Sequence, residues 1–162
     1  MFRRLPVAGA LLGALMLASC GHLLPGRVAL GQGEAEVLAA AGQPTARHAL
    51  PSGGTRLEYA TGPMGRETWM FDIDAQGRVV GIEQVLADAQ FLALQPGISR
   101  EELLRTLGRP GERRSGGRQG GEVWSYRYPN NDCLWFQVSL DDEGRVLSGT
   151  YGNDPRCEMR LR

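Results

Sequence analysis

Side chains able to do chemistry are scarce in this sequence. The 162 residues include three Cys, two His (His22 and His48) and no Lys, so all 18 basic side chains are Arg. No Ser lies in a nucleophile-elbow motif, and the Gly-rich stretch 116–121 lacks the Lys that follows a phosphate-binding loop. We expect a multi-ligand zinc site to need several carboxylates beside the two His and three Cys. We therefore expect no catalytic centre, no bound metal and no cofactor.

The N-terminal residues predict an export signal that ends at a cysteine. Arg3 and Arg4 precede an apolar run from residue 5 to 17, which is shorter than the roughly 20 residues that a membrane-spanning helix needs. We therefore assign residues 1–19 to a cleaved signal peptide and residues 20–30 to a tether. The alternative is an ordinary signal peptide in which Cys20 has no special role.

The segment Leu17-Ala18-Ser19-Cys20 resembles the lipobox of bacterial lipoproteins. The resemblance implies cleavage before Cys20 and attachment of several palmitate-type acyl chains, which together anchor a protein stably. Gly21 stands where an Asp would retain a lipoprotein in the inner membrane, so the implied location is the outer membrane, facing the periplasm. The mature chain would hold 16 Arg against 18 acidic residues, so we expect no nucleic-acid partner.

The rest of the chain contains an internal duplication. Residues 31–44 align with residues 97–110, and one further residue of offset aligns the remainder of the two copies. The shared landmarks are Val37 with Leu103, Gly42 with Gly108, Pro44 with Pro110, Leu57-Glu58-Tyr59 with Trp124-Ser125-Tyr126, and residues 74–79 with 141–146. Several landmarks in the same order indicate two copies of one small unit.

Each copy is predicted to be a short helix followed by a three-stranded antiparallel meander. Apolar residues at helical spacing end at Gly42 or Gly108, each followed by a Pro that stops the helix. Alternation over residues 134–140 and 69–73 predicts strands, and Asp-x-x-Gly-Arg predicts the turn that follows. A further helix is expected over residues 87–94. The prediction is an α+β fold with the helices on one side of the sheet, a first repeat over 31–86, a second over 87–157 and a tail over 158–162.

The motif G-x-S-x-x-E-L-L-x-x-L-G-x-P, followed by W-x-Y and a strand ending in D-x-x-G-R-V, resembles the SmpA/OmlA (BamE-like) lipoprotein domain. The second copy fits this pattern well and the first more loosely. Two copies in one chain depart from the single domain of BamE and are similar to the arrangement in the beta-lactamase inhibitory protein. Both resemblances imply a module that binds other proteins and has no catalytic role.

Cys133 and Cys157 are expected to form a disulfide. In an exported protein the compartment is oxidising, and hairpin pairing brings the two residues within reach of each other. The alternative, a redox-active pair, lacks the C-x-x-C spacing.

Partner-binding residues are predicted on one strand and one loop. Trp135 and Gln137 alternate with the apolar face of their strand, so Trp135 is interpreted as an exposed interface anchor, with burial against the other repeat or the C-terminal tail as the alternative. Arg113, Arg114 and Arg118 lie in the expected loop 112–122. That loop could contact a protein or anionic lipid, or be a solvated loop.

These observations favour a non-catalytic outer-membrane lipoprotein that serves as a protein-binding or scaffold module. Its resemblance implies a part in β-barrel assembly or envelope integrity. An alternative is a periplasmic inhibitor or binding module for a secreted hydrolase. A third hypothesis is an envelope enzyme that uses His48.

Overall fold

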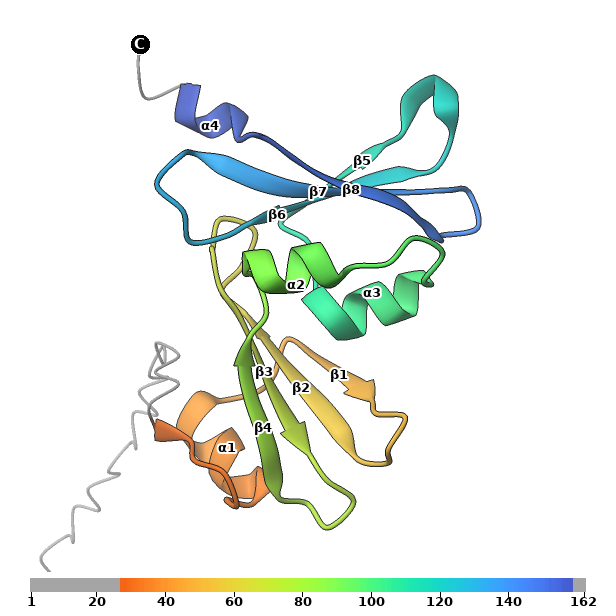
Figure 1. The fold of residues 1–162 in the computed structure, drawn as a ribbon. Coiled ribbons are helices and arrows are strands. Elements are labelled where there is room, and N and C mark those ends of the chain that lie inside the picture. Colours follow the sequence, from red (N-terminus) through yellow and green to blue (C-terminus); the bar gives the residue numbers. More distant parts are fainter. Residues whose placement is uncertain (1–26, 159–162) are drawn as a thin grey trace, which may run out of the picture.

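The computed structural model describes residues 27–158, which form two four-stranded antiparallel sheets and several short helices (Figure 1). Sheet 1 contains, in order, β1 (Ala46–Ala49), β2 (Thr55–Ala60), β3 (Thr68–Ile73) and β4 (Val79–Gln84). Sheet 2 contains β5 (Glu112–Ser115), β6 (Glu122–Arg127), β7 (Leu134–Leu140) and β8 (Val146–Asn153). The helices are α1 (Glu34–Ala41), α2 (Asp88–Ala93), α3 (Arg100–Leu107) and α4 (Pro155–Glu158), with a 3₁₀ turn η2 (Gly117–Gln119).

Part of the predicted architecture lies outside these residues. The signal peptide 1–19, Cys20 and the tail beyond residue 158 are not among the residues that the structure describes. Within residues 27–158, no helix is both long and apolar enough to cross a membrane.

The α+β class is confirmed, but each sheet has one strand more than predicted. The additional strands are β1 and β5, and β5 occupies the start of the expected loop 112–122. Both are edge strands of four residues, with the sequences ARHA and ERRS. A short edge strand is held mainly by backbone hydrogen bonds, so it does not need the alternating apolar pattern by which strands are detected in a sequence.

The two repeats share the same local contacts, as the internal alignment predicts. The Tyr59 hydroxyl donates to the carbonyl of Gly42 at 2.9 Å, and the Tyr126 hydroxyl donates to that of Gly108 at 3.2 Å. Before each helix, an isolated bridge ties the chain to the residue that precedes the last strand of its sheet, Gly33 to Arg78 and Ser99 to Arg145. The repeated unit is therefore a helix and a four-stranded sheet closed by the same hydrogen bonds.

The smaller core lies between α1 and one face of sheet 1. Val37 on α1 packs with strand residues of that face, namely Leu57, Tyr59, Phe71, Ile73 and Val79. Val28 belongs to the same cluster and is 7% exposed. Val28, near the C-terminal end of the predicted tether 20–30, therefore packs against the first repeat.

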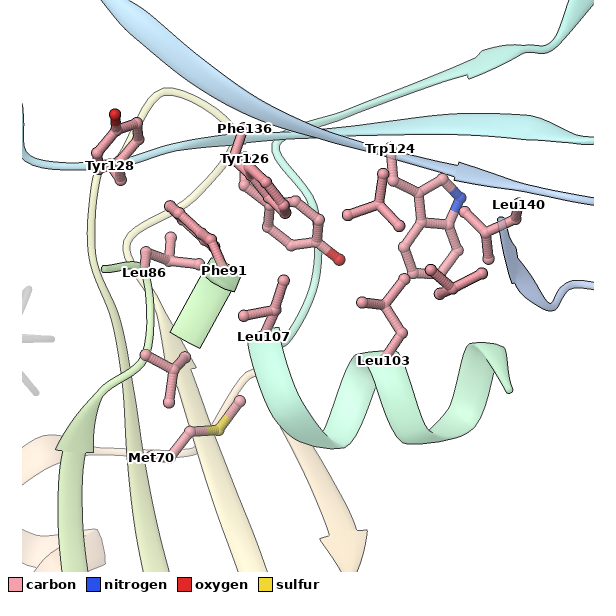
Figure 2. Close-up of a cluster of buried hydrophobic side chains, with 13 residues drawn as sticks. Met70, Leu86, Phe91, Leu103, Leu107, Trp124, Tyr126, Tyr128, Phe136 and Leu140 are labelled. Carbon is pink, nitrogen blue, oxygen red and sulfur yellow. The ribbon is translucent and has the colours of Figure 1, made fainter. Parts of the chain in front are cut away.

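The larger core joins the repeats. Figure 2 shows Leu103 and Leu107 of α3 directed toward the aromatic side chains of sheet 2, and Met70 of β3 belongs to the same cluster. Helices α2 and α3 thus lie between the two sheets (Figure 1). Sheet 1 has α1 on one face and α3 against the other, so the prediction that all helices lie on one side of the sheet is wrong for sheet 1.

A buried carboxylate also joins the repeats. Glu58, on the face of β2 opposite α1, is 0% exposed. Its Oε2 lies 2.9 Å from His48 Nε2, and its Oε1 accepts from the Thr45 hydroxyl at 3.3 Å. The same Oε1 accepts the backbone N–H of Arg109 at 3.0 Å, just after α3. One of its partners therefore comes from the second repeat.

A second polar contact lies on the same face. The guanidinium of Arg56 donates to both carboxylate oxygens of Asp72, at 2.6 and 2.7 Å, and to the Arg105 carbonyl of α3 at 3.0 Å. The hydrogen bond and charge of Asp72 outweigh burial and raise the pKa of Arg56. A cation near the C-terminal end of a helix is favourable because carbonyl groups there lack helical partners.

The close approach of the repeats can be measured with two equivalent glycines. Gly42 and Gly108 end α1 and α3 at φ values of 78° and 76°. A Cβ built on Gly42 would meet nothing within 4 Å. A Cβ built on Gly108 would lie 2.9 Å from Thr68, 3.0 Å from Glu58 and 3.1 Å from Met70.

We expect Gly42→Ala to cost about 1 kcal/mol in unfolding free energy from backbone strain alone. Gly108→Ala should cost about 2–4 kcal/mol because overpacking adds to that strain. Urea unfolding of both variants checks this, and equal costs would contradict it.

Candidate functional site

Trp135 is buried. It lies on the face of sheet 2 opposite α3, as the alternation predicted, but only 3% of it is exposed. The guanidinium carbons of Arg127 and Arg114 lie 5.2 and 5.8 Å from its ring centre, close enough for cation–π attraction. The interpretation of Trp135 as an exposed interface anchor is therefore wrong. We call this face, which holds Val123, Ser125, Arg127, Trp135, Gln137 and Ser139, the outer face of sheet 2.

A buried ion pair, absent from the sequence predictions, lies beside Trp135. Arg127 donates to Asp154 from Nε at 2.5 Å and from Nη2 at 3.0 Å, and both residues are at most 6% exposed. Arg127 also donates to the Pro63 carbonyl of the first repeat at 3.1 Å. Burial would raise the pKa of Asp154, but the hydrogen bonds from Arg127 and the Arg156 backbone, with their charges, outweigh burial and lower it.

The disulfide holds the chain that carries Asp154. Cys133 and Cys157 are bonded, as predicted, with their Cα atoms 5.9 Å apart. Asp154 donates its backbone N–H to Cys133 at 2.8 Å and accepts that of Cys157 at 2.9 Å. The short helix α4 makes the return that a simple hairpin could not, because pairing places Asn153 opposite Leu134 and leaves Cys157 beyond the sheet.

The predicted arginines do not form one patch. Arg113 points to the α3 side of β5, where its guanidinium lies 4.1 Å from the Trp124 ring, whereas Arg114 is directed towards Trp135. Both contribute to a shallow depression of about 380 Å³ beside Glu122 at the end of the hairpin. Arg118 lies in η2 at the hairpin tip. The structure thus brings Arg113 and Arg114 to one rim and leaves Arg118 apart from it.

Gln137 is half-buried on the outer face and committed to a neighbour. Its side-chain amide donates to the Ser125 hydroxyl of the adjacent strand at 3.1 Å. Its two cross-strand neighbours, Ser125 and Thr150, are polar and uncharged. Around Gln137 the outer face therefore offers hydrogen-bonding groups rather than an apolar anchor.

A pocket of about 270 Å³ lies where the repeats meet. Its walls come from the β2–β3 connection, the segment after α3 and the end of β6, and are lined by Thr45, Ala60, Gly62, Pro63, Gly65, Glu67, Thr68, Leu86, Arg109, Pro110, Gly111, Tyr126 and Arg127. Arg109 donates weakly to the Thr45 carbonyl at 3.4 Å. Among residues 27–158, no carboxylate lies within 4 Å of the Arg109 guanidinium. The pocket is thus a mainly apolar hollow whose lining includes the carboxylate of Glu67 and two arginines, Arg109 and the Arg127 that is paired with Asp154.

The structure places His48 in the joint between the repeats, where Glu58 holds it. Only 12% of the His48 side chain is exposed. Over the described part of the chain, no group of three or more His, Cys, Asp or Glu is arranged to hold a metal ion. The hypothesis of an envelope enzyme that uses His48 stays a prediction.

No family model and no curated protein matches this chain. Among solved structures, it is similar to an extracellular protein containing a SCP domain from Bacillus anthracis str. Ames, at 14% sequence identity and a TM-score of 0.32. The match covers 100% of this chain and 52% of the other, so this chain spans about half of that protein's length. At such a TM-score the likeness supports no statement about activity or partners.

The Arg127–Asp154 pair makes stability depend on pH. We expect Asp154→Asn to lower the unfolding free energy at neutral pH by about 3 kcal/mol, because Arg127 stays buried without its charged partner. Since the folded-state pKa of Asp154 is lowered, this stabilisation is present above the unfolded-state pKa and is lost as pH falls through the folded-state value. Urea unfolding across acidic pH should show a loss in the wild type that the variant lacks.

The matched control for this pH series is Asp132→Asn, because Asp132 is an exposed carboxylate in the loop between β6 and β7. Its pH profile should follow that of the wild type. Identical profiles for Asp154→Asn and the wild type would show that the buried pair does not set the acid sensitivity.

Proposed function

We propose that this chain is a non-catalytic outer-membrane lipoprotein of the SmpA/OmlA type, anchored through Cys20 and acting as a protein-binding or scaffold module in the periplasm. The observation that carries the proposal is the duplicated unit, whose sequence motif resembles that family and whose two copies close with the same hydrogen bonds. Two rigid copies fused through a shared core make a scaffold with a fixed surface.

The position of the anchor favours a protein partner for the arginine hairpin over anionic lipid. Val28 is fixed in the core of the first repeat and lies eight residues after Cys20, so the tether spans at most about 28 Å. In Figure 1 the β5–β6 hairpin and α1 lie at opposite ends of the molecule. An acylated Cys20 would hold the first repeat near the membrane and leave Arg113, Arg114 and Arg118 directed away from it.

A second candidate function is that of a periplasmic inhibitor or binding module for a secreted hydrolase. The tandem arrangement favours it, because two fused sheets present a longer surface than one. The two functions differ in the partner, which a capture experiment identifies.

The lipid anchor is tested by labelling. In a bacterial host grown with a radiolabelled or clickable palmitate analogue, the full-length chain should take up label and fractionate with the outer membrane. The Cys20→Ala variant should take up none. A chain that is processed but unlabelled would contradict the lipoprotein proposal and leave only an exported protein.

The partner is tested by capture from detergent-solubilised envelopes of the native host. Recovery of barrel-assembly components would support the first function, and recovery of a hydrolase would support the second. We expect the double variant Arg114→Glu/Arg118→Glu to reduce recovery about tenfold or more, because a partner surface complementary to Arg would be repelled. Gln43→Glu, exposed on the first repeat, is the control and should keep the partner. Unchanged recovery with the double variant would exclude the hairpin as the binding surface.

A further inference from the structure

The last strand of sheet 2 is an unprotected edge. Natural sheets protect their edges with short strands, charged side chains or covering segments, because free backbone groups can pair with another chain. Here the edge strands β1 and β5 are short and charged, and β4 carries Glu83. By contrast β8 has eight residues, VLSGTYGN, with no charged residue and no Pro.

Little of the described chain covers this edge. Gly97 and Ile98 pair with Val146 only, through hydrogen bonds of 2.7 and 2.9 Å. Within residues 27–158, no backbone hydrogen bond from outside sheet 2 reaches residues 147–153. Leu147 is 56% exposed and Tyr151 is 38% exposed. Strand β8 therefore combines free backbone hydrogen-bonding groups with two exposed large apolar side chains.

We propose that β8 pairs with β8 of a second copy of this chain, antiparallel and centred on Gly149, so that two sheets join into one of eight strands. This register places Leu147 opposite the partner copy's Tyr151 and Ser148 opposite its Thr150. Apolar–aromatic and hydroxyl–hydroxyl pairs are favourable cross-strand neighbours. The absence of charge means that the two-fold axis brings no like charges together, and a two-fold contact closes without growing into a fibre.

Two features prepare the strand for this pairing. A Cβ at Gly149 would lie 2.4 Å from the Phe136 ring, so this position must be glycine and places no side chain of its own at the proposed axis. The Tyr151 ring is fixed, because its hydroxyl donates to Asp88 at 2.8 Å and its ring packs 5.3 Å from Phe136. Burial and the hydrogen bond to Asp88 raise the pKa of Tyr151 to about 12, so its hydroxyl stays protonated at neutral pH.

The test is the self-association of the full chain, measured by sedimentation in a density-matched nonionic detergent. The wild type should form a dimer reversibly. The double variant Ser148→Lys/Thr150→Lys places like charges opposite each other and should weaken the dimer about tenfold or more. The variant Ser148→Lys/Thr150→Glu places opposite charges across the axis and should restore it. Ser115→Lys, on the other edge of sheet 2, should leave it unchanged.

Hydrogen exchange distinguishes this mode of pairing from others. Amides of residues 147–153 should exchange more slowly as the dimer forms. A monomeric wild type, or a dimer that both charge variants leave unchanged, would overturn the proposal. Protection of these amides only when an unrelated extended peptide is added would also overturn it, and would identify β8 as an edge for a different partner.

Discussion

Glu58 sets the constraint on which the rest of this structure depends. A carboxylate with no exposed surface needs hydrogen-bond donors for its oxygens, because an unpaired buried charge is very unfavourable. Two of its neighbours, His48 and Thr45, belong to the first repeat, but the backbone N–H of Arg109 belongs to the second. The first sheet is therefore complete only when the second repeat is seated on it. The two copies share one folding unit although each has its own sheet.

The outer face of sheet 2, which is the equivalent face of the second repeat, does not have this requirement. The positions equivalent to Glu58 and Met70 are Ser125 and Gln137, which satisfy each other with a hydrogen bond of 3.1 Å. Trp135, which stands where the first copy has Thr68, is covered from within its own repeat by Arg114 and Arg127. The face of sheet 1 that carries Glu58 thus needs a contact from the other repeat, whereas Ser125 and Gln137 on the outer face of sheet 2 satisfy each other. In repeat proteins a polar outer face of this kind is typical of a terminal unit.

The sequence allows the duplication, the main strands, the helix ends and the disulfide to be predicted, because each leaves a local or periodic signal. Alternation at residues 134–140 and the glycines that end α1 and α3 are examples. Edge strands β1 and β5 leave no such signal. The burial of Trp135 depends on Arg127 and on the Asp154 that holds it, 27 residues away, and no spacing rule connects these residues. Contacts that are distant in sequence account for what could not be predicted.

Because Glu58 and Ser125 occupy equivalent positions but differ in chemistry, the order of the two repeats in the chain matters. If the two copies exchanged places, Ser125 would face the helix of the other copy and would offer no carboxylate to the backbone N–H that follows that helix. Glu58 would then lie on a face that no other repeat covers. The copies have therefore diverged into a leading and a closing member that are no longer interchangeable. A third copy placed on the outer face of sheet 2 would find no carboxylate at Ser125 to accept the backbone N–H that follows its helix.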